Sequence, residues 1–130
     1  MLYAIICYND DRDVFSWSQE KDDAVMGALQ KVHDRLEAKG QLGPAFRLES
    51  VKTAKTYRKT PAGVVDGPFA ETKEQLLGLY LVDVPDMDAA LDISKQLSEA
   101  NPGLGCYEVR PIKLFVPGKT LSAEAMLEQA

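Results

Sequence analysis

The sequence predicts an α+β fold of the ferredoxin-like type, with the element order βαββαβ and an additional hairpin in the middle. Two segments, residues 2–8 and 76–84, are apolar on both faces, which is typical of strands in the centre of a sheet. Each of them is followed by a helical segment with one apolar stripe. The first and third core strands are central in the ferredoxin-like order, so these observations agree with one another.

The first strand and the first helix have clear boundaries. The strand reads LYAIICY, a β-branched and aromatic run that ends at the polar segment NDDRD. The helix is expected to begin after Ser18, whose hydroxyl suits an N-cap, and to end at Gly40. Its apolar residues recur at helical spacing and form one stripe: Val25, Leu29, Val32 and Leu36.

The signals are weaker between residues 42 and 63. FRLES and KTAKTYR alternate polar and apolar residues, and KTPAG is typical of a turn, so we expect exposed, hairpin-like strands here. Residues 76–84 then form the second central strand. Leucines occupy one of its faces, and the other face carries Tyr80, Val82 and Val84.

The remaining chain supplies a second helix, a last strand and a tail. Asp86 is the expected N-cap of the helix, whose buried stripe is formed by Ala89, Ala90, Ile93 and Leu97. Residues 106–116 form a strand whose polar positions place it near an edge of the sheet. We expect one domain over residues 1–116. Residues 117–130 are then a tail that is either a short helix capped by Ser122 or mobile.

Length and charge narrow the range of functions. A chain of 130 residues is long enough for one domain with a real core. Its net charge of −5 and the lack of a Lys/Arg cluster disfavour nucleic-acid binding. The segment MLYAIICYND has no basic start, and its apolar run is too short for a signal peptide or a membrane span. We therefore expect a cytoplasmic protein that does not bind membranes.

The two cysteines, Cys7 and Cys106, each lie inside a strand-like run. A reducing cytosol keeps such residues as thiols, and free cysteines are usually small buried side chains. With one histidine and no CxxC pair, a zinc site has too few soft ligands. We expect neither a metal nor another cofactor.

The second apolar face of the sheet predicts a partner. Two helices cover only one face of a four-stranded sheet in this topology, so the other apolar face needs a different cover. A second copy of the chain is the simplest cover, and we therefore expect a homodimer.

A dense motif, DGPFAETKE, lies just before the second central strand. Asp66-Gly67 is a turn pair, since Gly readily takes a positive φ, and Pro68 fixes the next φ. Phe69 is expected to be a buried apolar anchor, and the charges of ETKE are expected to neutralise one another locally. On these grounds the motif is a connector that turns sharply and enters the strand in a fixed register.

The stretch DGPFAETKEQLLGLYLVDVPDMDAALDISKQL resembles the signature of the YCII-related superfamily, in the branch named for its Asp-Gly-Pro-Phe (DGPF) motif. MLYAIICYND and YEVRP are similar to the opening and closing strands of that family, so the resemblance covers residues 1–116. It implies a dimeric α+β ferredoxin-like fold, assembled as a dimeric α/β barrel. Genes of this branch often neighbour extracytoplasmic-function sigma factors, which implies a regulatory link to such a factor.

The resemblance also implies an activity for some members. Some YCII-like proteins look like dehydrochlorinase-type enzymes with a His–Asp pair whose His lies on the first helix. That position falls near Leu29 here, and His33 lies about one turn later, so the pair is not carried over to this chain.

Three residues are candidates for acid–base catalysis. Asp66 and Lys73, with Glu74 as a ligand-binding neighbour, either line a pocket beside the sheet or form a turn with a local ion pair. His33 lies at the margin of the apolar stripe. With Glu37 four residues later it is either a general base with its orienting partner or part of a solvated helix flank.

Arg110, in the last strand, is a further ligand-binding candidate. It is either a clamp for a ligand carboxylate or the partner of an acidic neighbour such as Glu108.

Two functions of different classes follow. The first is a small cytoplasmic, dimeric module that binds a small molecule or acts in regulation. The alternative is a lyase- or hydrolase-like enzyme with acid–base residues in a pocket near residues 66–74. A pocket that holds two of Asp66, Lys73 and His33 within hydrogen-bond distance favours the enzyme, and separate positions favour the module.

Overall fold

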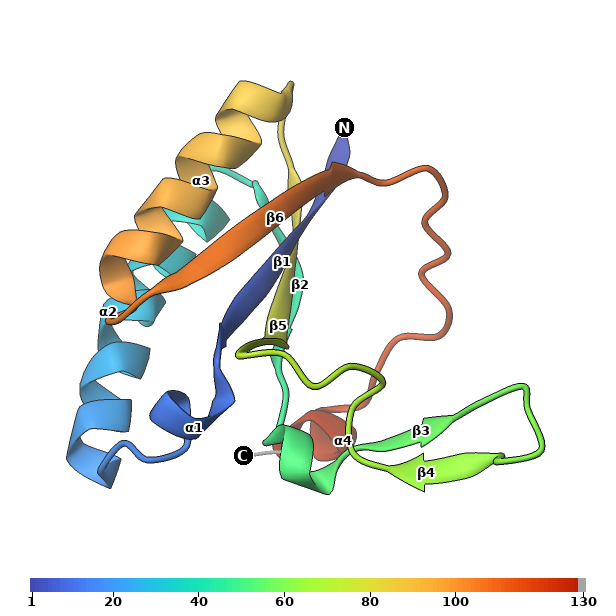
Figure 1. Cartoon of the computed structure of the whole chain (residues 1–130). Helices are drawn as coiled ribbons and strands as arrows, with labels where there is room; N and C mark the ends of the chain where they lie inside the picture. Colours follow the sequence, from blue (N-terminus) through green and yellow to red (C-terminus); the bar gives the residue numbers. More distant parts are fainter. Residues whose placement is uncertain (129–130) are drawn as a thin grey trace.

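Four strands form one antiparallel sheet, and two long helices cover one of its faces (Figure 1). The structure, a computed structural model, describes residues 1–128. The strands are β1 (Leu2–Asp10), β2 (Leu42–Arg47), β5 (Glu74–Asp83) and β6 (Gly105–Pro111), and the helices are α2 (Gln19–Ala38) and α3 (Met87–Ala100). Across the sheet the strands follow the order β2-β5-β1-β6.

This order confirms the α+β class and is compatible with the predicted ferredoxin-like fold. The two segments predicted to be central are β1 and β5, which pair with each other along their whole lengths. The strands at the edges are β2 and β6. β6 ends at Pro111 rather than at residue 116. Its neighbour β1 begins at Leu2, so after the bond from Ile112 N to Leu2 O, at 3.0 Å, the chain has no further residue of β1 to pair with.

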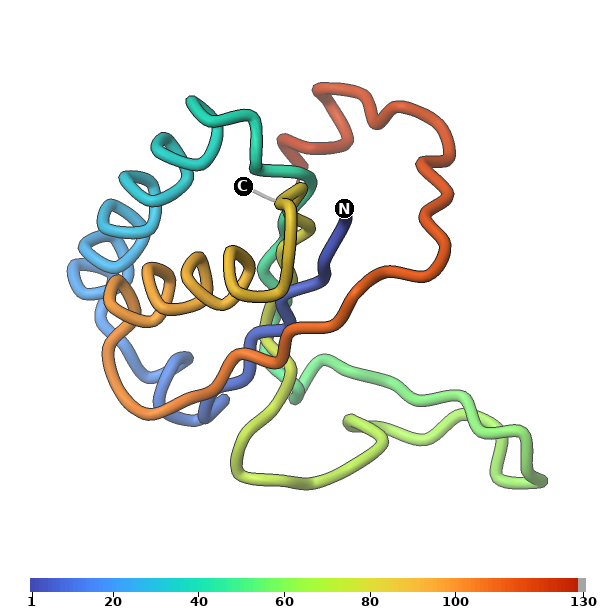
Figure 2. The backbone as a smooth tube through the Cα atoms, turned by 90° about the horizontal axis from the view of Figure 1, so that it is seen from above, coloured from blue at the N-terminus to red at the C-terminus, as the bar shows by residue number. Residues whose placement is uncertain are grey.

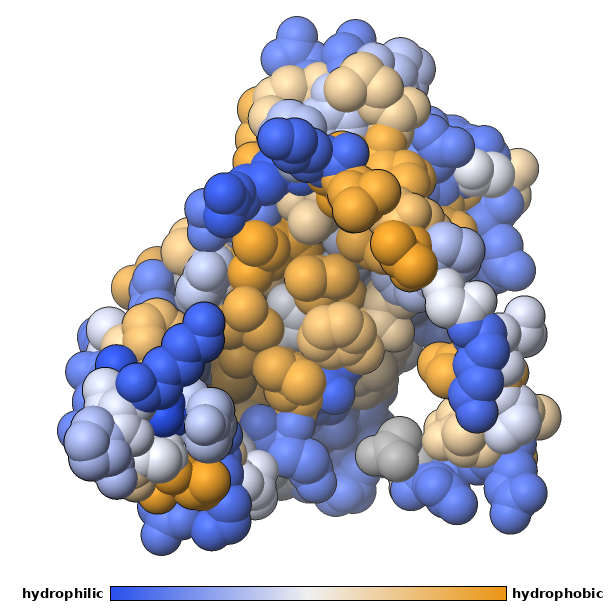
Figure 3. Space-filling view, turned by 90° about the vertical axis from the view of Figure 1, so that its right-hand side faces the viewer, coloured by the Kyte–Doolittle hydropathy of each residue, from blue (hydrophilic) through white to orange (hydrophobic). Residues whose placement is uncertain are grey.

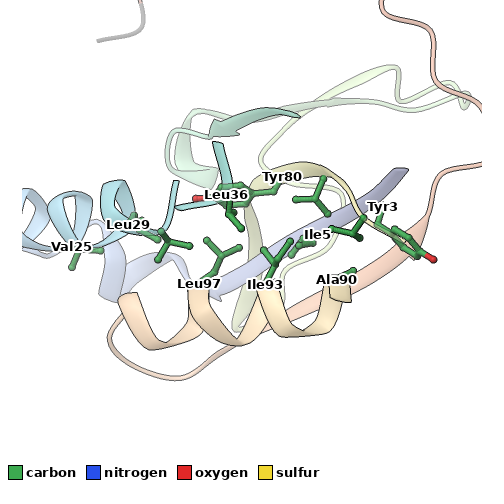
Figure 4. Close-up of a cluster of buried hydrophobic side chains, with 12 residues drawn as sticks. Tyr3, Ile5, Val25, Leu29, Leu36, Tyr80, Ala90, Ile93 and Leu97 are labelled. Atoms are coloured by element: carbon green, nitrogen blue, oxygen red, sulfur yellow. The ribbon is translucent and has the colours of Figure 1, made fainter. Parts of the chain in front are cut away.

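The core lies between the helices and the sheet (Figure 4). Alternate residues of the two central strands face it, because successive side chains of a strand point to opposite faces. From the strands come Tyr3, Ile5, Tyr80 and Val82. The predicted stripe of α2 is buried throughout. α3 begins after Asp86, whose side chain accepts from Ala89 N as predicted, and it buries Ala90, Ile93 and Leu97.

A four-residue helix, α1 (Asp11–Val14), follows β1 where only a polar boundary was predicted. Asp11 is buried, and its carboxylate accepts hydrogen bonds from Ser50 Oγ at 2.8 Å and Val51 N at 2.9 Å. These bonds tie α1 to the 3₁₀ turn η1 (Val51–Thr53), which leads into the middle segment.

The middle segment forms a hairpin about the predicted turn KTPAG, but with a different second strand from the one expected, because the start of FRLES belongs to β2 of the main sheet. Its strands, β3 (Lys55–Tyr57) and β4 (Val64–Asp66), pair only with each other and make a two-stranded sheet of their own. The hairpin extends away from the main sheet on the side opposite the helices (Figures 1 and 2). Several of its apolar side chains are exposed: Tyr57, Val64 and Val65.

After β6 the chain returns along that same side of the sheet and ends in the short helix α4 (Ala123–Leu127) (Figure 1). Ser122 caps this helix, since its Oγ accepts a hydrogen bond from Ala125 N at 3.0 Å. Residues 123–127 of the tail are thus helical, and residues 129–130 lie outside the described residues. None of the helices within residues 1–128 has the length and apolar character needed to span a lipid bilayer.

The sheet face away from α2 and α3 is apolar, as Figure 3 shows. Ala4 lies opposite Leu81, and Ile6 lies opposite Leu79, so the side chains of both central strands meet there. On the edge strand β2, Phe46 lies opposite Leu79 and is 51% exposed. The second apolar face that the sequence predicts is therefore present on the chain.

Candidate functional site

A cavity of about 250 Å³ lies between the sheet and the helices, at the end where α2 begins and α3 ends. Apolar residues of α2 such as Val25 and Leu29 form much of its wall. Polar groups reach it from several elements, as is typical of ligand pockets. Those groups belong to Cys7, Tyr8, Asn9, Trp17, His33, Arg47, Tyr80, Asn101 and Tyr107.

His33 and Tyr80 form the central polar contact of the cavity. His33 Nε2 lies 2.7 Å from the Tyr80 hydroxyl, and the ring centroids are 5.4 Å apart. Burial lowers the pKa of His33, against a smaller opposite effect of Asp34, so the imidazole is neutral at neutral pH. Burial also raises the pKa of Tyr80, which keeps the phenol protonated. A neutral imidazole beside a protonated phenol has the parts of an acid–base pair.

Tyr107 and Asn101 form a second polar contact on the opposite side of the cavity. Asn101, the C-cap of α3, donates from Nδ2 to the Tyr107 hydroxyl at 2.9 Å. Burial raises the pKa of Tyr107, although the hydrogen bond from Asn101 opposes this effect. Cys7 is half-buried on β1 beside Tyr107, and burial raises the pKa of its thiol to about 12. The thiol and both phenols are therefore uncharged at neutral pH.

Trp17, just before α2, contributes an unpaired donor. Its Nε1 is buried, and it is the one buried side-chain nitrogen or oxygen without a hydrogen-bond partner in the described part of the chain. The Lys21 ammonium lies 5.2 Å from the centroid of the indole ring, which favours this orientation of the ring through a cation–π contact. Phe15, two residues before Trp17, is 39% exposed.

The cavity holds little net charge. Arg47 is the charged residue of its wall, and its guanidinium is paired with Asp22, with N–O distances of 2.7 and 3.3 Å. No aspartate or glutamate within residues 1–128 lines the cavity. The site therefore offers hydrogen bonds rather than a free charge.

The three predicted acid–base residues lie in different places. Asp66, at the end of β4, pairs with Lys55 Nζ across the hairpin at 2.6 Å, and both side chains are exposed. Lys73 is exposed just before β5 and forms no ion pair with any residue of the 1–128 range, so ETKE does not neutralise its own charges by salt bridges. His33 faces the cavity described above. The hydrogen bonds and ion pairs of the described residues bring none of the three together.

The two predicted ligand-binding residues also lie outside the cavity. Glu74 Oε2 accepts a long hydrogen bond from Cys106 Sγ, at 3.6 Å. Arg110 is exposed on β6 and makes no ion pair among the residues described, while its expected partner Glu108 accepts from the Tyr8 hydroxyl at 3.1 Å. Cys106 is itself exposed because it lies on an edge strand, so the expectation that both cysteines are buried is wrong for this one.

The expectation that Phe69 is a buried anchor is wrong for the single chain, since the side chain is 75% exposed. The motif is held by its backbone instead. Arg58 Nη2 donates to Phe69 O at 3.0 Å, and Thr56 Oγ1 donates to Gly67 O at 2.8 Å. The positive φ predicted at Gly67 is confirmed at +95°. The ring therefore stays outside while the hairpin fixes the turn.

Sequence reasoning missed most of the polar groups in the cavity, namely Trp17, Tyr80, Asn101 and Tyr107. A signal was present, because a tryptophan or tyrosine in a core element carries a polar atom that usually finds a partner when it is buried. The pairing itself has no local signature. His33 and Tyr80 are 47 positions apart, and their contact depends on how α2 packs over β5.

Comparisons of the sequence with known proteins show similarity to one family and leave the chemistry of the cavity open. The sequence profile of the YCII-related domain matches residues 1–116. An uncharacterized protein of Rhizobium meliloti (strain 1021) is similar over 121 residues at 50% identity, which covers 92% of this chain and 98% of that protein. A match of this extent identifies the family: the chain belongs to the YCII-related family.

Proposed function

We propose that the chain is a ligand-binding module, active as a homodimer in the cytoplasm, that holds a small and largely apolar molecule in its cavity. The observation that carries this proposal is the cavity of about 250 Å³, in which polar groups converge within an apolar wall. An engineered apolar cavity of about 150 Å³ is enough to bind benzene, so this one has room for a substituted ring.

The positions of the predicted catalytic residues support a module over an enzyme built on the DGPF motif. Asp66 is engaged by Lys55 on an exposed hairpin, and Lys73 is exposed. Neither contacts His33 through a hydrogen bond or an ion pair of the described residues. A catalytic centre needs its acid and base within reach of one substrate atom, and the lack of a direct contact between these side chains is an argument for the module.

The apolar second face of the sheet supports the homodimer. A patch of this kind is unfavourable in water, and a self-complementary surface is the usual route to a two-fold dimer. Ile6 and Leu79 lie in register at its centre, and the hairpin and the tail lie on the same side of the sheet (Figure 2). A second chain stacked on this face gives the dimeric barrel type of assembly that the family resemblance implies.

Acid–base catalysis inside the cavity is the second candidate function, and one specific observation favours it. The neutral imidazole of His33 contacts the protonated hydroxyl of Tyr80 at 2.7 Å, facing the space where a ligand would bind. In such an enzyme, which keeps the lyase- or hydrolase-like reaction class, His33 acts as the base and Tyr80 as its proton partner. A regulatory link to a sigma factor stays a prediction from the family resemblance.

Benzene tests the module directly, because it probes an apolar cavity without requiring a particular polar group. We expect benzene to bind the wild-type chain in a ligand-detected NMR titration, and Ala45→Phe to weaken that binding at least tenfold. Ala45 is an exposed residue of β2 at the cavity wall, so a larger side chain there obstructs the cavity without overpacking the core.

Ala62→Phe, on the exposed tip of the hairpin, is the matched control, and we expect it to bind benzene as the wild type does. Equal binding by all three proteins, or no binding by the wild type, would remove the basis of the proposal.

A further inference from the structure

We propose that the cavity selects an uncharged molecule that carries an oxygen acceptor, and that this oxygen binds the indole N–H of Trp17. This inference rests on the proposed ligand-binding function and names the class of ligand. It follows from the unused hydrogen-bond donors and from the charge of the cavity wall.

The indole N–H of Trp17 is the first part of the argument. Within residues 1–128 its Nε1 is buried and has no acceptor, although the ring lines the cavity. Buried polar groups in folded proteins are nearly always hydrogen-bonded, because an unpaired one loses its bond to water without replacement. A ligand oxygen in the cavity supplies the acceptor that the protein itself does not.

The second part is the polarity of the remaining groups. The Tyr107 hydroxyl oxygen already accepts from Asn101 Nδ2, and its own proton is donated to no described residue. The Cys7 thiol makes a long contact of 3.8 Å with Ile5 O, and Tyr80 is engaged by His33. Two donors of the wall, on Trp17 and Tyr107, thus have no acceptor among the described residues, and an oxygen on the ligand supplies one.

The third part is charge. A cationic ligand meets no carboxylate on the wall formed by the described residues. A carboxylate ligand loses its hydration, and the guanidinium of Arg47 that would compensate is already engaged by both carboxylate oxygens of Asp22. An uncharged ketone, ester or amide avoids both costs and still accepts the two hydrogen bonds. The lowered pKa of His33 agrees with this, because it keeps the site free of an additional positive charge at neutral pH.

Four compounds that share a benzene ring distinguish an uncharged acceptor from a charged or purely apolar ligand: benzene, acetophenone, benzoate and benzylamine. They are titrated against the full chain at neutral pH by ligand-detected NMR. We expect acetophenone to bind about threefold to tenfold more tightly than benzene, which is the usual net effect of one or two neutral hydrogen bonds. Benzoate and benzylamine should bind more weakly than acetophenone.

Trp17→Phe tests the assigned donor, because it keeps an aromatic ring and removes only the N–H group and part of the ring. We expect this variant to bind benzene nearly as the wild type does and to lose most of the preference for acetophenone. Tyr107→Phe should lose part of that preference, and it carries the test if Trp17→Phe does not fold. Tyr57→Phe removes an exposed hydroxyl on β3, far from this wall, and should change nothing.

The outcomes separate this inference from the function on which it rests. Absence of benzene binding overturns the proposed function itself. Benzene binding without a preference for acetophenone, or a preference that both variants retain in full, overturns only the assignment of the acceptor. Tighter binding of benzoate or benzylamine than of acetophenone overturns the uncharged class.

Discussion

The contact between His33 and Tyr80 determines the cost of changing either residue. The sequence places His33 at the margin of the apolar stripe, where His33→Ala should cost no more than about 0.5 kcal/mol, as at ordinary surface sites. The structure predicts a larger loss of stability, because Tyr80 is buried and its hydroxyl hydrogen-bonds to His33 Nε2. Loss of the imidazole leaves that hydroxyl unpaired, at a cost of about 1–2 kcal/mol.

Urea denaturation of the wild type and His33→Ala measures this difference. Lys31→Ala, on an exposed position of the same helix, is the matched control and should remain within about 0.5 kcal/mol of the wild type. The pH dependence gives an independent test. Burial lowers the pKa of His33 in the folded chain, whereas the unfolded chain keeps a value near 6.5.

Between these two values the unfolded state binds more protons, so the free energy of unfolding increases with pH in that window. The contribution of His33 is complete above about pH 6.5, and it is lost as the pH falls through the folded-state value. His33→Gln should remove this part of the acid destabilisation. An unchanged pH profile in that variant would mean that the imidazole titrates normally in the folded chain.

At the scale of elements, local periodicity predicts most of the fold. The stripe of α2, the Asp86 cap of α3 and the two-sided apolar strands are each encoded within a short window of sequence, and all are confirmed. The short helix α1 depends less on its local sequence. Asp10 caps it locally by accepting from Arg12 N, but its place in the fold depends on hydrogen bonds that Asp11 accepts from Ser50 and Val51, about forty positions away. No local pattern reveals a partner at that distance.

The same distinction between local patterns and distant contacts explains why sequence reasoning missed most of the candidate site. The cavity lies where α2 begins and α3 ends, and its polar groups come from segments that the sequence assigns to separate elements. Side-chain periodicity identifies which face of each element is buried, but it does not show which polar atoms meet across the layer. The acid–base residues suggested by the motif therefore lie outside the cavity, while Trp17 and Tyr107 lie in its wall.

The buried carboxylate of Asp11 should hold the base of the hairpin to the domain. Asp11→Ala leaves the Ser50 hydroxyl and the Val51 amide without their acceptor, and we expect a loss of about 1–3 kcal/mol in the free energy of unfolding. Backbone amides in the hairpin, residues 51–66, should also exchange hydrogen faster, because this contact connects it to α1.

Urea denaturation and hydrogen-exchange mass spectrometry measure the two effects. Asp13→Ala removes an exposed carboxylate from the same short helix and should change neither quantity. Equal exchange in the hairpin of both variants would show that another contact holds it.

At the scale of the whole molecule, two exposed features lie on one side of the sheet: its apolar face and the hairpin (Figures 2 and 3). A hairpin of two short strands is marginally stable alone in water, and this one exposes apolar side chains. It is also basic. Residues 52–66 hold four Lys or Arg and one Asp, in a chain whose net charge is −5. A second copy of the chain offers both an apolar surface and the opposite charge.

The exposed side chain of Phe69 is also consistent with a second copy of the chain packed against the hairpin. The side chain lies next to the hairpin and is 75% exposed in the single chain, so Phe69→Ala should change the stability of an isolated chain by no more than about 0.5 kcal/mol. If the hairpin lies against a second copy, the substitution weakens association of the two chains instead of the fold of each chain. Phe69→Ala should then raise the dissociation constant of the dimer by about tenfold or more, equivalent to at least about 1.4 kcal/mol.

The homodimer itself gives the last prediction. We expect the wild-type chain to sediment at micromolar concentration with twice its mass of 14.3 kDa, because stacking two apolar sheet faces removes both from water. Ile6→Lys should yield a folded species of one chain. Ile6 lies at the centre of that face, and a lysine there has Glu108 opposite it on β6 as a partner within its own chain. Leu91→Lys places the same charge on an exposed position of α3, in the other layer, and should remain dimeric. Analytical ultracentrifugation of the three proteins tests this prediction. An interface on this face is contradicted if the wild type sediments as one chain, or if the Ile6→Lys variant stays dimeric.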